Sequence, residues 1–329
     1  MPYIVRMRVL VSGGTGFLGG HIVQELKDAG HEPIVFARSS SNTKPLEKRG
    51  IEVRRGAFDA PASLRKACDG VDAVVHAAGG GVVRKIADYY RANSESTEAL
   101  LASMRPEMRF VLISSLAAHG PALRKRAGFD TPVAFEDDAD RPTSHYGKSK
   151  KRAELACANS TQRCTLLRPP ALYGAGEYRM VPLFRLAQRG VVPTVHPEGT
   201  LSLLSGRDCA RAVVCALGSE HEGMFYVSEP HPITRHAMAK AIARFGGHSR
   251  VISVPQSVVQ GAGRLSEALA AARGKHAMFN RDKAADICAP HQSCDPTHAE
   301  TSLGWKAKER FIDSTCDIGR AYQDKGWLP

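Results

Sequence analysis

The chain has 329 residues, 43% of them hydrophobic and 24% charged, which is the composition of an ordinary globular protein. It contains no run of about 18 apolar residues, so we expect no transmembrane helix. The first residues, MPYIVRMRVLVSGG, lack the apolar core and cleavage site of a signal peptide, and a cytoplasmic location is the default expectation.

The formal net charge of +12 indicates an anionic partner, such as a phosphorylated cofactor, an anionic membrane surface or a nucleic acid. The charges are scattered, and the longest basic cluster is Arg124–Arg126. Because no arginine and aromatic module of the RNA-binding kind is present, we do not expect nucleic-acid binding. Peripheral contact with an anionic membrane stays open.

Strands and helices alternate along the first half of the chain. Apolar runs and glycine or proline breaks predict strands at 7–11, 34–37, 50–56, 71–79, 109–115 and 164–174, with helices at 17–26, 61–70, 86–104 and 144–159. Such alternation predicts right-handed βαβ units, and therefore an α/β protein with a Rossmann-type, doubly wound parallel sheet.

The pattern loosens after Tyr173, although 207–217 and 224–227 predict one more helix and strand of the same sheet. We therefore assign 1–168 and 207–228 to a dinucleotide-binding domain. The remaining 169–206 and 229–329 form a smaller, mostly helical substrate cap over the carboxyl edge of the sheet, where open α/β sheets bind ligands.

The turn between the first strand and the first helix, SGGTGFLG, is rich in glycine. Gly13 permits a tight turn, Gly16 lets the backbone approach a pyrophosphate, and Gly19 lets the helix pack close to the sheet. The N-terminus of the helix supplies N–H groups for the phosphates. Because the glycines stand between a strand and a helix, they predict dinucleotide binding.

The end of the second strand distinguishes the two nicotinamide dinucleotides. An acidic residue there would bind the ribose of NAD, whereas a cation accepts the 2′-phosphate of NADP. Arg38 occupies this position, and Ser39 and Ser40 add hydroxyl groups. NADP(H) is therefore the preferred cofactor, with NAD(H) as the alternative.

The segment HYGKSKK contains Tyr146 and, one helical turn later, Lys150. Residues four apart share a helix face, and a neighbouring ammonium lowers the pKa of a tyrosine. The strand before this helix ends with Ser114 and Ser115, at the edge where a substrate would bind. Each feature alone is common, but together they predict an acid–base site for moving a proton to or from an alcohol.

These motifs resemble those of the extended short-chain dehydrogenase/reductases, the superfamily of the NAD-dependent epimerases and dehydratases. The resembling segments run nearly end to end: GGTGFLG, VDAVVHAAG, YYRANSESTEAL, FVLISSLAAHG, HYGKSKKRAE, LLRPPALYGAGE, LLSGRDCARAV and LGWKAKERF. The resemblance implies that Ser115, Tyr146 and Lys150 form the catalytic triad, with Lys150 also holding the nicotinamide ribose.

The turn, the second strand and the resemblance together define the expected ligand contacts. The cofactor contacts are Gly13, Thr15, Gly16, Phe17, Leu18, Gly19, Arg38, Ser39, Asp59, Ala77, Ala78, Ser114, Pro169 and Leu172, and the substrate contacts are Asn93, Leu116 and Arg179. The sequence departs from the family at Ala57, where an aspartate usually contacts adenine, and Asp59 is its expected substitute. The charged stretch 123–142 is long enough to form a flap near the site.

Two enzyme activities and one binding function fit these residues. The favoured one is an NADPH-dependent ketone reductase, or the reverse alcohol dehydrogenase, because Arg38 favours an exchangeable cofactor. Similarity to bacterial reductases of lipid-like or steroid-type 3-oxo compounds, and the apolar stretch 251–279, favour a hydrophobic substrate. The alternatives are a nucleotide-sugar epimerase or dehydratase with retained NAD, and a non-catalytic NADP sensor. A homodimer formed through helices 86–104 and 144–159 is usual in the families that the chain resembles.

The eight cysteines include no CxxC pair and are expected to be reduced thiols. The run CAPHQSCDPTH contains Cys288, His291, Cys294 and His298 at a spacing that a tetrahedral zinc site could use. One short run is weak support for a metal, so a proline-broken loop is the favoured interpretation.

Overall fold

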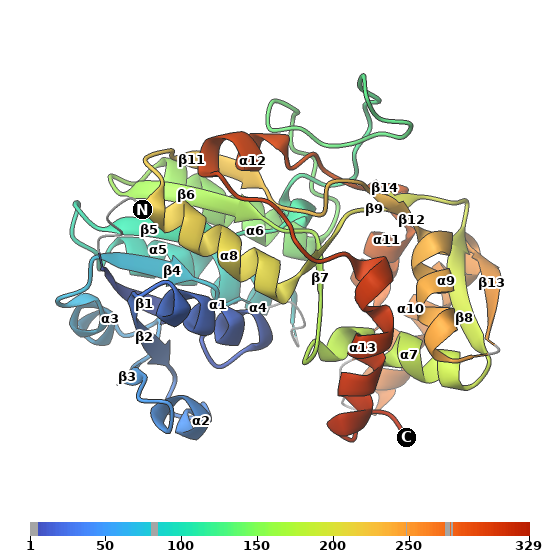
Figure 1. Cartoon of the computed structure of the whole chain (residues 1–329), viewed down its shortest axis with the longest axis horizontal. Helices are drawn as coiled ribbons and strands as arrows, with labels where there is room; N and C mark the ends of the chain where they lie inside the picture. The colour runs from blue at the N-terminus through green and yellow to red at the C-terminus, as the bar shows by residue number, and fades with distance from the viewer. Residues whose placement is uncertain (1–5, 80–84, 248, 274–276, 278) are drawn as a thin grey trace.

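A central parallel sheet organises the computed structural model, which describes residues 6–79, 85–247, 249–273, 277 and 279–329. Its seven strands follow the order β11-β6-β5-β4-β1-β2-β3 (Figure 1). Their bounds are β1 Arg8–Ser12, β2 Glu32–Ala37, β3 Glu52–Arg55, β4 Ala73–His76, β5 Arg109–Ile113, β6 Arg163–Arg168 and β11 Gly223–Tyr226. All pairings in this sheet are parallel, which confirms the predicted doubly wound fold.

Helices cover both faces of the sheet, and each face has its own apolar core. On one face α1 (Phe17–Asp28) and α8 (Gly206–Gly218) pack against β1, β2 and β5, and Figure 1 shows both helices in front of the sheet. On the other face lie α3 (Pro61–Cys68), α5 (Ser96–Leu101) and α6 (His145–Ala158). The strands are buried from both sides, which is why they appear in the sequence as continuous apolar runs.

The helix predicted over 86–104 is interrupted. It consists of α4 (Ile86–Tyr90), a π-helical turn over Arg91–Glu95 and α5. A π-helical turn inserts one extra residue into a helix and is frequent at functional sites. Asn93 lies in the middle of this turn, where it is buried.

The second half of the chain adds three small sheets that the sequence did not predict. The pairs are β7 (Ala171–Tyr173) with β10 (Leu203–Ser205), and β8 (Val191–His196) with β13 (Arg250–Pro255); β9 (Thr200–Leu201) pairs with β12 (Ile233–Thr234) and β14 (His291–Gln292). The helices here are α7 (Val181–Gln188), α9 (Arg235–Phe245), α10 (Gln256–Ala272), α11 (Arg281–Cys288) and α13 (Phe311–Asp324). Phe184, Ile242, Phe311 and Tyr322 belong to the separate apolar core of this region.

One helix of the chain's last third returns to the sheet. Ala299 and Leu303 of α12 (Thr297–Leu303), followed by Trp305, pack in the core on the α1 and α8 face. The Trp305 indole donates a 3.0 Å hydrogen bond to the Asp208 carbonyl. Within the described parts of the chain, no helix is both long and apolar enough to cross a bilayer.

Candidate active site

The predicted site residues gather at the carboxyl edge of the sheet, where the strand order reverses. Strand β1 lies between β2 and β4, and β5 and β6 follow on the β4 side. Gly13, Ala77, Ser114 and Pro169 come directly or almost directly after the ends of β1, β4, β5 and β6. In a doubly wound sheet this crevice is the ligand-binding position.

The glycine turn fits tightly against the neighbouring strand and its own helix. Gly13 has a φ of +79°, and a Cβ there would lie 2.6 Å from the Ala78 nitrogen and 2.8 Å from the Ala77 carbonyl carbon. A Cβ on Gly19 would overlap the Gly13 carbonyl oxygen and lie 2.7 Å from the Gly14 Cα. Any side chain at either position would therefore force the turn, the helix and the sheet apart.

The start of α1 is open to an anion. A Cβ on Gly16 would meet one carbonyl oxygen of the turn at 3.3 Å and no other atom within 4 Å. The first turn carries no acidic side chain, and within the described residues the N–H groups of Phe17, Leu18 and Gly19 donate no hydrogen bond. Thr15 is exposed beside them. Unused N–H groups at a helix N-terminus suit a pyrophosphate, so the turn fits a dinucleotide.

Two arginines lie near the end of β2. Arg38 and Ser39 are exposed, and in the part of the chain that the structure describes the Arg38 guanidinium has no hydrogen-bond or ion-pair partner. Arg55, at the end of β3, donates to the Ser39 carbonyl at 3.3 Å and pairs with Glu47 at 3.3 Å. Arg55 was not among the predicted cofactor contacts, although the register of β2 and β3 places it beside Ala37. Asp59 is exposed on the loop after β3.

A buried histidine connects the strands beneath the turn. His76, the last residue of β4, is hydrogen-bonded to Ser12 at 2.6 Å and to Ser96 at 3.0 Å. Burial, together with the charge of Lys150, lowers the pKa of His76 to about 3. His76 is therefore a neutral linker between β1, β4 and α5, a role that the sequence analysis missed.

Ser115 and Tyr146 come together from two different elements. Ser115 caps the short 3₁₀ turn Leu116–Ala118, and its hydroxyl lies close enough to Tyr146 to act on its pKa. Tyr146 is the second residue of α6, whose first turn is capped by Ser144. A Cβ on Gly147 would overlap the Ala117 carbonyl oxygen, so the glycine after Tyr146 permits this close approach.

Opposing influences act on the Tyr146 phenol. Burial raises its pKa, and the charge of Asp286 raises it further. The neighbouring Ser115 hydroxyl and the charge of Arg179 lower the pKa, and the net shift is upward. The sequence analysis expected Lys150 to be the cation that acts on this tyrosine. The charge that lowers the Tyr146 pKa here is that of Arg179, whereas the Lys150 Nζ donates to the Ile113 carbonyl at the end of β5.

Lys150 is buried among backbone and amide oxygens. Its Nζ donates to the Ile113 carbonyl at 2.8 Å. A Cβ on Gly79 would lie 3.1 Å from the Lys150 Nζ and 2.7 Å from the Asn93 Oδ1. The two polar groups therefore approach the backbone at Gly79, where a side chain would block them. Burial lowers the Lys150 pKa to about 8 against the opposing charge of Glu154.

The other predicted contacts lie around this group. The Leu116 N–H donates to the Pro169 carbonyl at 2.9 Å, and Leu172 in β7 packs at the margin of the sheet core. Ser114 is buried, and its hydroxyl donates to Glu154 Oε1 at 2.5 Å. Its side chain is therefore engaged with the interior.

A buried ion network supports the site from behind. Arg168, at the end of β6, donates to Glu154 at 2.5 and 2.7 Å, to Asp140 at 2.7 and 2.8 Å, and to the Tyr226 hydroxyl at 3.0 Å. Asp140 belongs to the charged stretch 123–142 that the sequence analysis treated as a flap. The network attaches the end of that stretch to β6 and α6.

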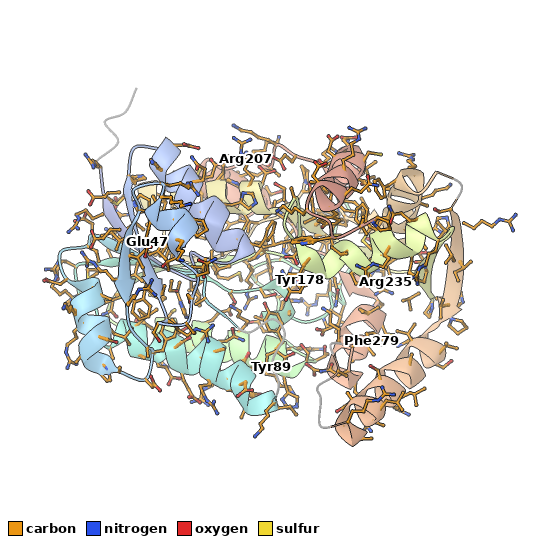
Figure 2. All side chains as sticks on the ribbon, turned by 90° about the horizontal axis from the view of Figure 1, so that it is seen from below. Glu47, Tyr89, Tyr178, Arg207, Arg235 and Phe279 are labelled. Atoms are coloured by element: carbon orange, nitrogen blue, oxygen red, sulfur yellow. The ribbon has the colours of Figure 1, made fainter. Side chains whose placement is uncertain are left out.

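Two acidic residues of α11 face the start of α6. Asp282 accepts the His145 N–H at 3.1 Å, and Asp286 lies close enough to raise the pKa of both Tyr146 and Tyr89. The Tyr89 ring centroid lies 6.0 Å from that of Tyr146. Helix α11 therefore lies beside Tyr146 and the start of α6. Figure 2 labels Tyr89, which belongs to α4.

Arg179 is also held by an acidic partner. Its Nε and Nη2 donate to the two carboxylate oxygens of Glu177 at 2.7 and 2.5 Å. Glu177 is buried, whereas the Arg179 side chain is 46% exposed. The guanidinium is thus fixed at the surface of the crevice near Tyr146.

The candidate zinc ligands do not converge. His291 is hydrogen-bonded to Thr200 at 2.9 Å, and the His298 ring stacks on Phe225 with centroids 4.8 Å apart. Cys288 ends α11 and Cys294 is fully buried. Across the residues that the structure describes, no three His, Cys, Asp or Glu side chains are grouped to hold a metal.

Comparison with known proteins places this site in a family. Residues 9–227 match the NAD dependent epimerase/dehydratase family. The chain is 27% identical over 326 residues to the ceramide reductase of Caulobacter vibrioides (strain NA1000 / CB15N), covering 98% of this chain and 96% of that protein. It is 32% identical over 190 residues to the 2-alkyl-3-oxoalkanoate reductase of Stenotrophomonas maltophilia (strain K279a), covering 56% of each.

Solved structures share the fold. The UDP-glucose 4-epimerase of Thermus thermophilus, in complex with NAD, aligns with a TM-score of 0.74 and 22% identity, over 96% of this chain and 99% of that one. The family that this chain matches is NAD dependent by its name, and the glycine turn of this chain fits a dinucleotide. The chain belongs to the NAD dependent epimerase/dehydratase family, and it is an oxidoreductase of the extended short-chain dehydrogenase/reductase type.

Proposed function

We propose that this protein uses NADP(H) to reduce a ketone, or to oxidise the matching secondary alcohol, on a hydrophobic, lipid- or steroid-like substrate. The observation that carries the proposal is that Ser115, Tyr146 and Lys150 come together at the ligand-binding edge of the sheet, where the Ser115 hydroxyl is close enough to Tyr146 to lower its pKa. Lys150 lies behind the same edge, below the end of β5.

The residues have complementary roles in the direction of reduction. When bound, the nicotinamide supplies the hydride to the carbonyl carbon. Tyr146 donates its proton to the carbonyl oxygen, and its raised pKa keeps the phenol protonated at neutral pH. Ser115 hydrogen-bonds the same oxygen, and the charge of Arg179 stabilises the phenolate that remains. Lys150 holds the nicotinamide ribose, as the family resemblance implies.

The preference for NADP(H) rests on Arg38. Its guanidinium is exposed at the end of β2 and has no protein partner among the described residues, so it is available to a phosphate. Arg55 adds a second cation beside Ser39, although Glu47 shares its charge. A planar guanidinium suits a 2′-phosphate better than a ribose hydroxyl.

The proposal of a lipid-like ketone rests on the relatives. The relative that matches nearly the whole chain is named a ceramide reductase, and a second is named a 2-alkyl-3-oxoalkanoate reductase. Asn93, Leu116 and Arg179 are the proposed substrate contacts. Two alternative functions would give different experimental results. They are nucleotide-sugar epimerisation with retained NAD, and NADP sensing without catalysis.

The first experiment measures NADPH oxidation with a panel of long-chain ketones, steroids and sugar nucleotides. We expect turnover with a lipid-like ketone, and Tyr146→Phe should lower kcat about 100- to 10,000-fold while NADPH still binds. Tyr178→Phe, which changes an exposed neighbouring tyrosine, is the matched control and should retain activity. Purified protein that retains NAD⁺ and turns over only sugar nucleotides would contradict the proposal.

The second experiment tests the cofactor. Arg38→Ala should weaken NADPH binding about 10- to 100-fold, because a hydrogen bond to a charged group contributes about 1.5–3 kcal/mol, and should leave NADH binding unchanged. Arg65→Ala, an exposed arginine on α3, is the control. Equal losses for the two cofactors would show that Arg38 does not contact the 2′-phosphate.

Three broader proposals accompany this function. We propose the domain division into 1–168 with 207–228 and 169–206 with 229–329, a cytoplasmic location, and a homodimer. A shallow surface groove supports the dimer, because it lies between α5 and α6 and includes the 51% exposed Leu155. Sedimentation velocity would test the oligomeric state.

A further inference from the structure

Helix α10 carries an apolar stripe that the rest of the chain leaves uncovered. Val258, Leu265 and Leu269 are 56%, 60% and 47% exposed. Ala262 and Ala272 are also exposed and continue the spacing, so these five residues fall on one side of the helix. Isolated exposed leucines are common, but a row of them along one helix marks an interaction surface.

The stripe is distinct from the face of α10 that packs on the protein. Gly263 is the buried residue of the helix, and a Cβ there would lie 2.8 Å from the Ala284 Cβ and 3.0 Å from the Asn280 carbonyl oxygen. That close approach joins α10 to α11. Ile252 of β13 and Ile287 of α11, the two elements that pack on α10, are 46% and 37% exposed.

The surroundings of the stripe are basic. Residues 249–288 contain six Lys or Arg and three Asp or Glu, a net charge of +3. Arg264 is exposed on α10, and Arg273 is exposed directly after its last residue. The carboxylate of Glu267, also on α10, is paired with Arg281 at 3.4 Å. An exposed apolar stripe with basic flanks is typical of a helix that lies in the interface of an anionic bilayer.

We propose that α10 docks this protein on an anionic lipid bilayer, with Val258, Leu265 and Leu269 inserted at the level of the acyl chains. A second copy of the chain fits this surface less well, since two patches of the same charge would meet. Figure 2 shows the helices beside Phe279 at the edge of the molecule, away from the sheet.

Helices α10 and α11 both lie between the docking surface and the candidate catalytic tyrosine. Helix α11 packs on α10 at Ala284, and its Asp282 and Asp286 lie against the start of α6 beside Tyr146. A helix with its side chains is about 10 Å thick, so a lipid leaving the bilayer would travel about 20 Å along the two helices to reach the site. This consequence rests on the proposed lipid substrate, whereas bilayer binding does not.

The test is co-sedimentation of the full chain with phosphatidylcholine vesicles, with and without phosphatidylglycerol. We expect binding that requires phosphatidylglycerol and weakens with salt, and Leu265→Glu should lower the partition coefficient about tenfold or more. Leu123→Glu changes a 62% exposed leucine in the charged stretch 123–142 and should bind like the unchanged protein. Circular dichroism of each variant checks that the fold is retained.

Two results would overturn the proposal. One is the absence of binding to anionic vesicles, or equal binding by Leu265→Glu and the unchanged protein. The other is a dimer, detected by sedimentation velocity, that Leu265→Glu dissociates while vesicles are not bound, because a second copy would then cover the stripe. NADPH oxidation with a water-miscible ketone, measured without vesicles, tests the proposed function separately from docking.

Discussion

Lys150 should make the stability of this protein depend on pH in a window where an exposed lysine has no effect. The side chain is 5% exposed, and burial lowers its pKa from 10.5 to about 8. Below about pH 8 both the folded and the unfolded chain carry the proton, so Lys150 adds no pH dependence. Between about 8 and 10.5 the folded chain releases the proton and the unfolded chain keeps it. Stability must therefore rise with pH across this window and level off above it.

The size of the rise follows from the shift. The interval from about 8 to 10.5 corresponds to about 3 kcal/mol at 1.36 kcal/mol per pKa unit. Lys150→Met keeps the length of the side chain and removes the titrating group. Subtracting the two stability curves cancels the titration of tyrosines and cysteines that both proteins share.

The measurement is urea denaturation of the cofactor-free protein and of Lys150→Met, from neutral pH to above the ordinary pKa of lysine. Between about pH 8 and 10.5, the free energy of unfolding of the unchanged protein should rise by about 3 kcal/mol relative to that of Lys150→Met. Lys148→Met, at an exposed position on the same helix, should give a curve parallel to that of the unchanged protein. If Lys150→Met is also parallel, the lysine is solvated as an ammonium in the native state and the reasoning fails.

Two further substitutions test the packing behind the site by chemical denaturation. Gly19→Ala places a methyl group on the Gly13 carbonyl oxygen and should destabilise the fold by about 3 kcal/mol. Gly20→Ala meets no atom within 4 Å and should stabilise the fold by about 0.5–1 kcal/mol. Equal stability of the two variants would refute the close approach of α1 to the glycine turn. Arg168→Met leaves Glu154 buried without its main partner and should cost about 3–5 kcal/mol, and a cost below about 1 kcal/mol would mean that the network behaves like a surface ion pair.

The sheet could be predicted because its signals are local. Strands buried on both faces are largely apolar, as at Ala73–Val75 of β4, and each is followed by a turn or a helix start. The α6 boundaries agree with the prediction to within a residue because Ser144 is a standard N-cap, and its hydroxyl accepts the Gly147 N–H at 3.1 Å. The glycine turn was predictable for the same reason, since its residues are adjacent in the chain.

Other features depend on contacts between distant segments. Strand β13 pairs with β8 across more than 50 residues, and neither has a partner that the sequence alone identifies. Arg168 could be predicted to follow a strand, but its partners Glu154 and Asp140 come from a helix and a loop. The π-helical turn at Arg91–Glu95 has no local signature comparable to a cap or a proline.

The electrostatics of the tyrosine show why spacing alone was insufficient. Helical periodicity correctly indicates that Tyr146 and Lys150 share a face, but a shared face does not determine which polar group each side chain reaches. The Lys150 side chain reaches the Ile113 carbonyl, and Gly79 leaves room for its Nζ because it has no side chain. The cation that lowers the Tyr146 pKa is Arg179, which follows β7. A local pattern therefore identifies the proton donor, whereas the charges that adjust its pKa come from segments that only the folded chain brings together.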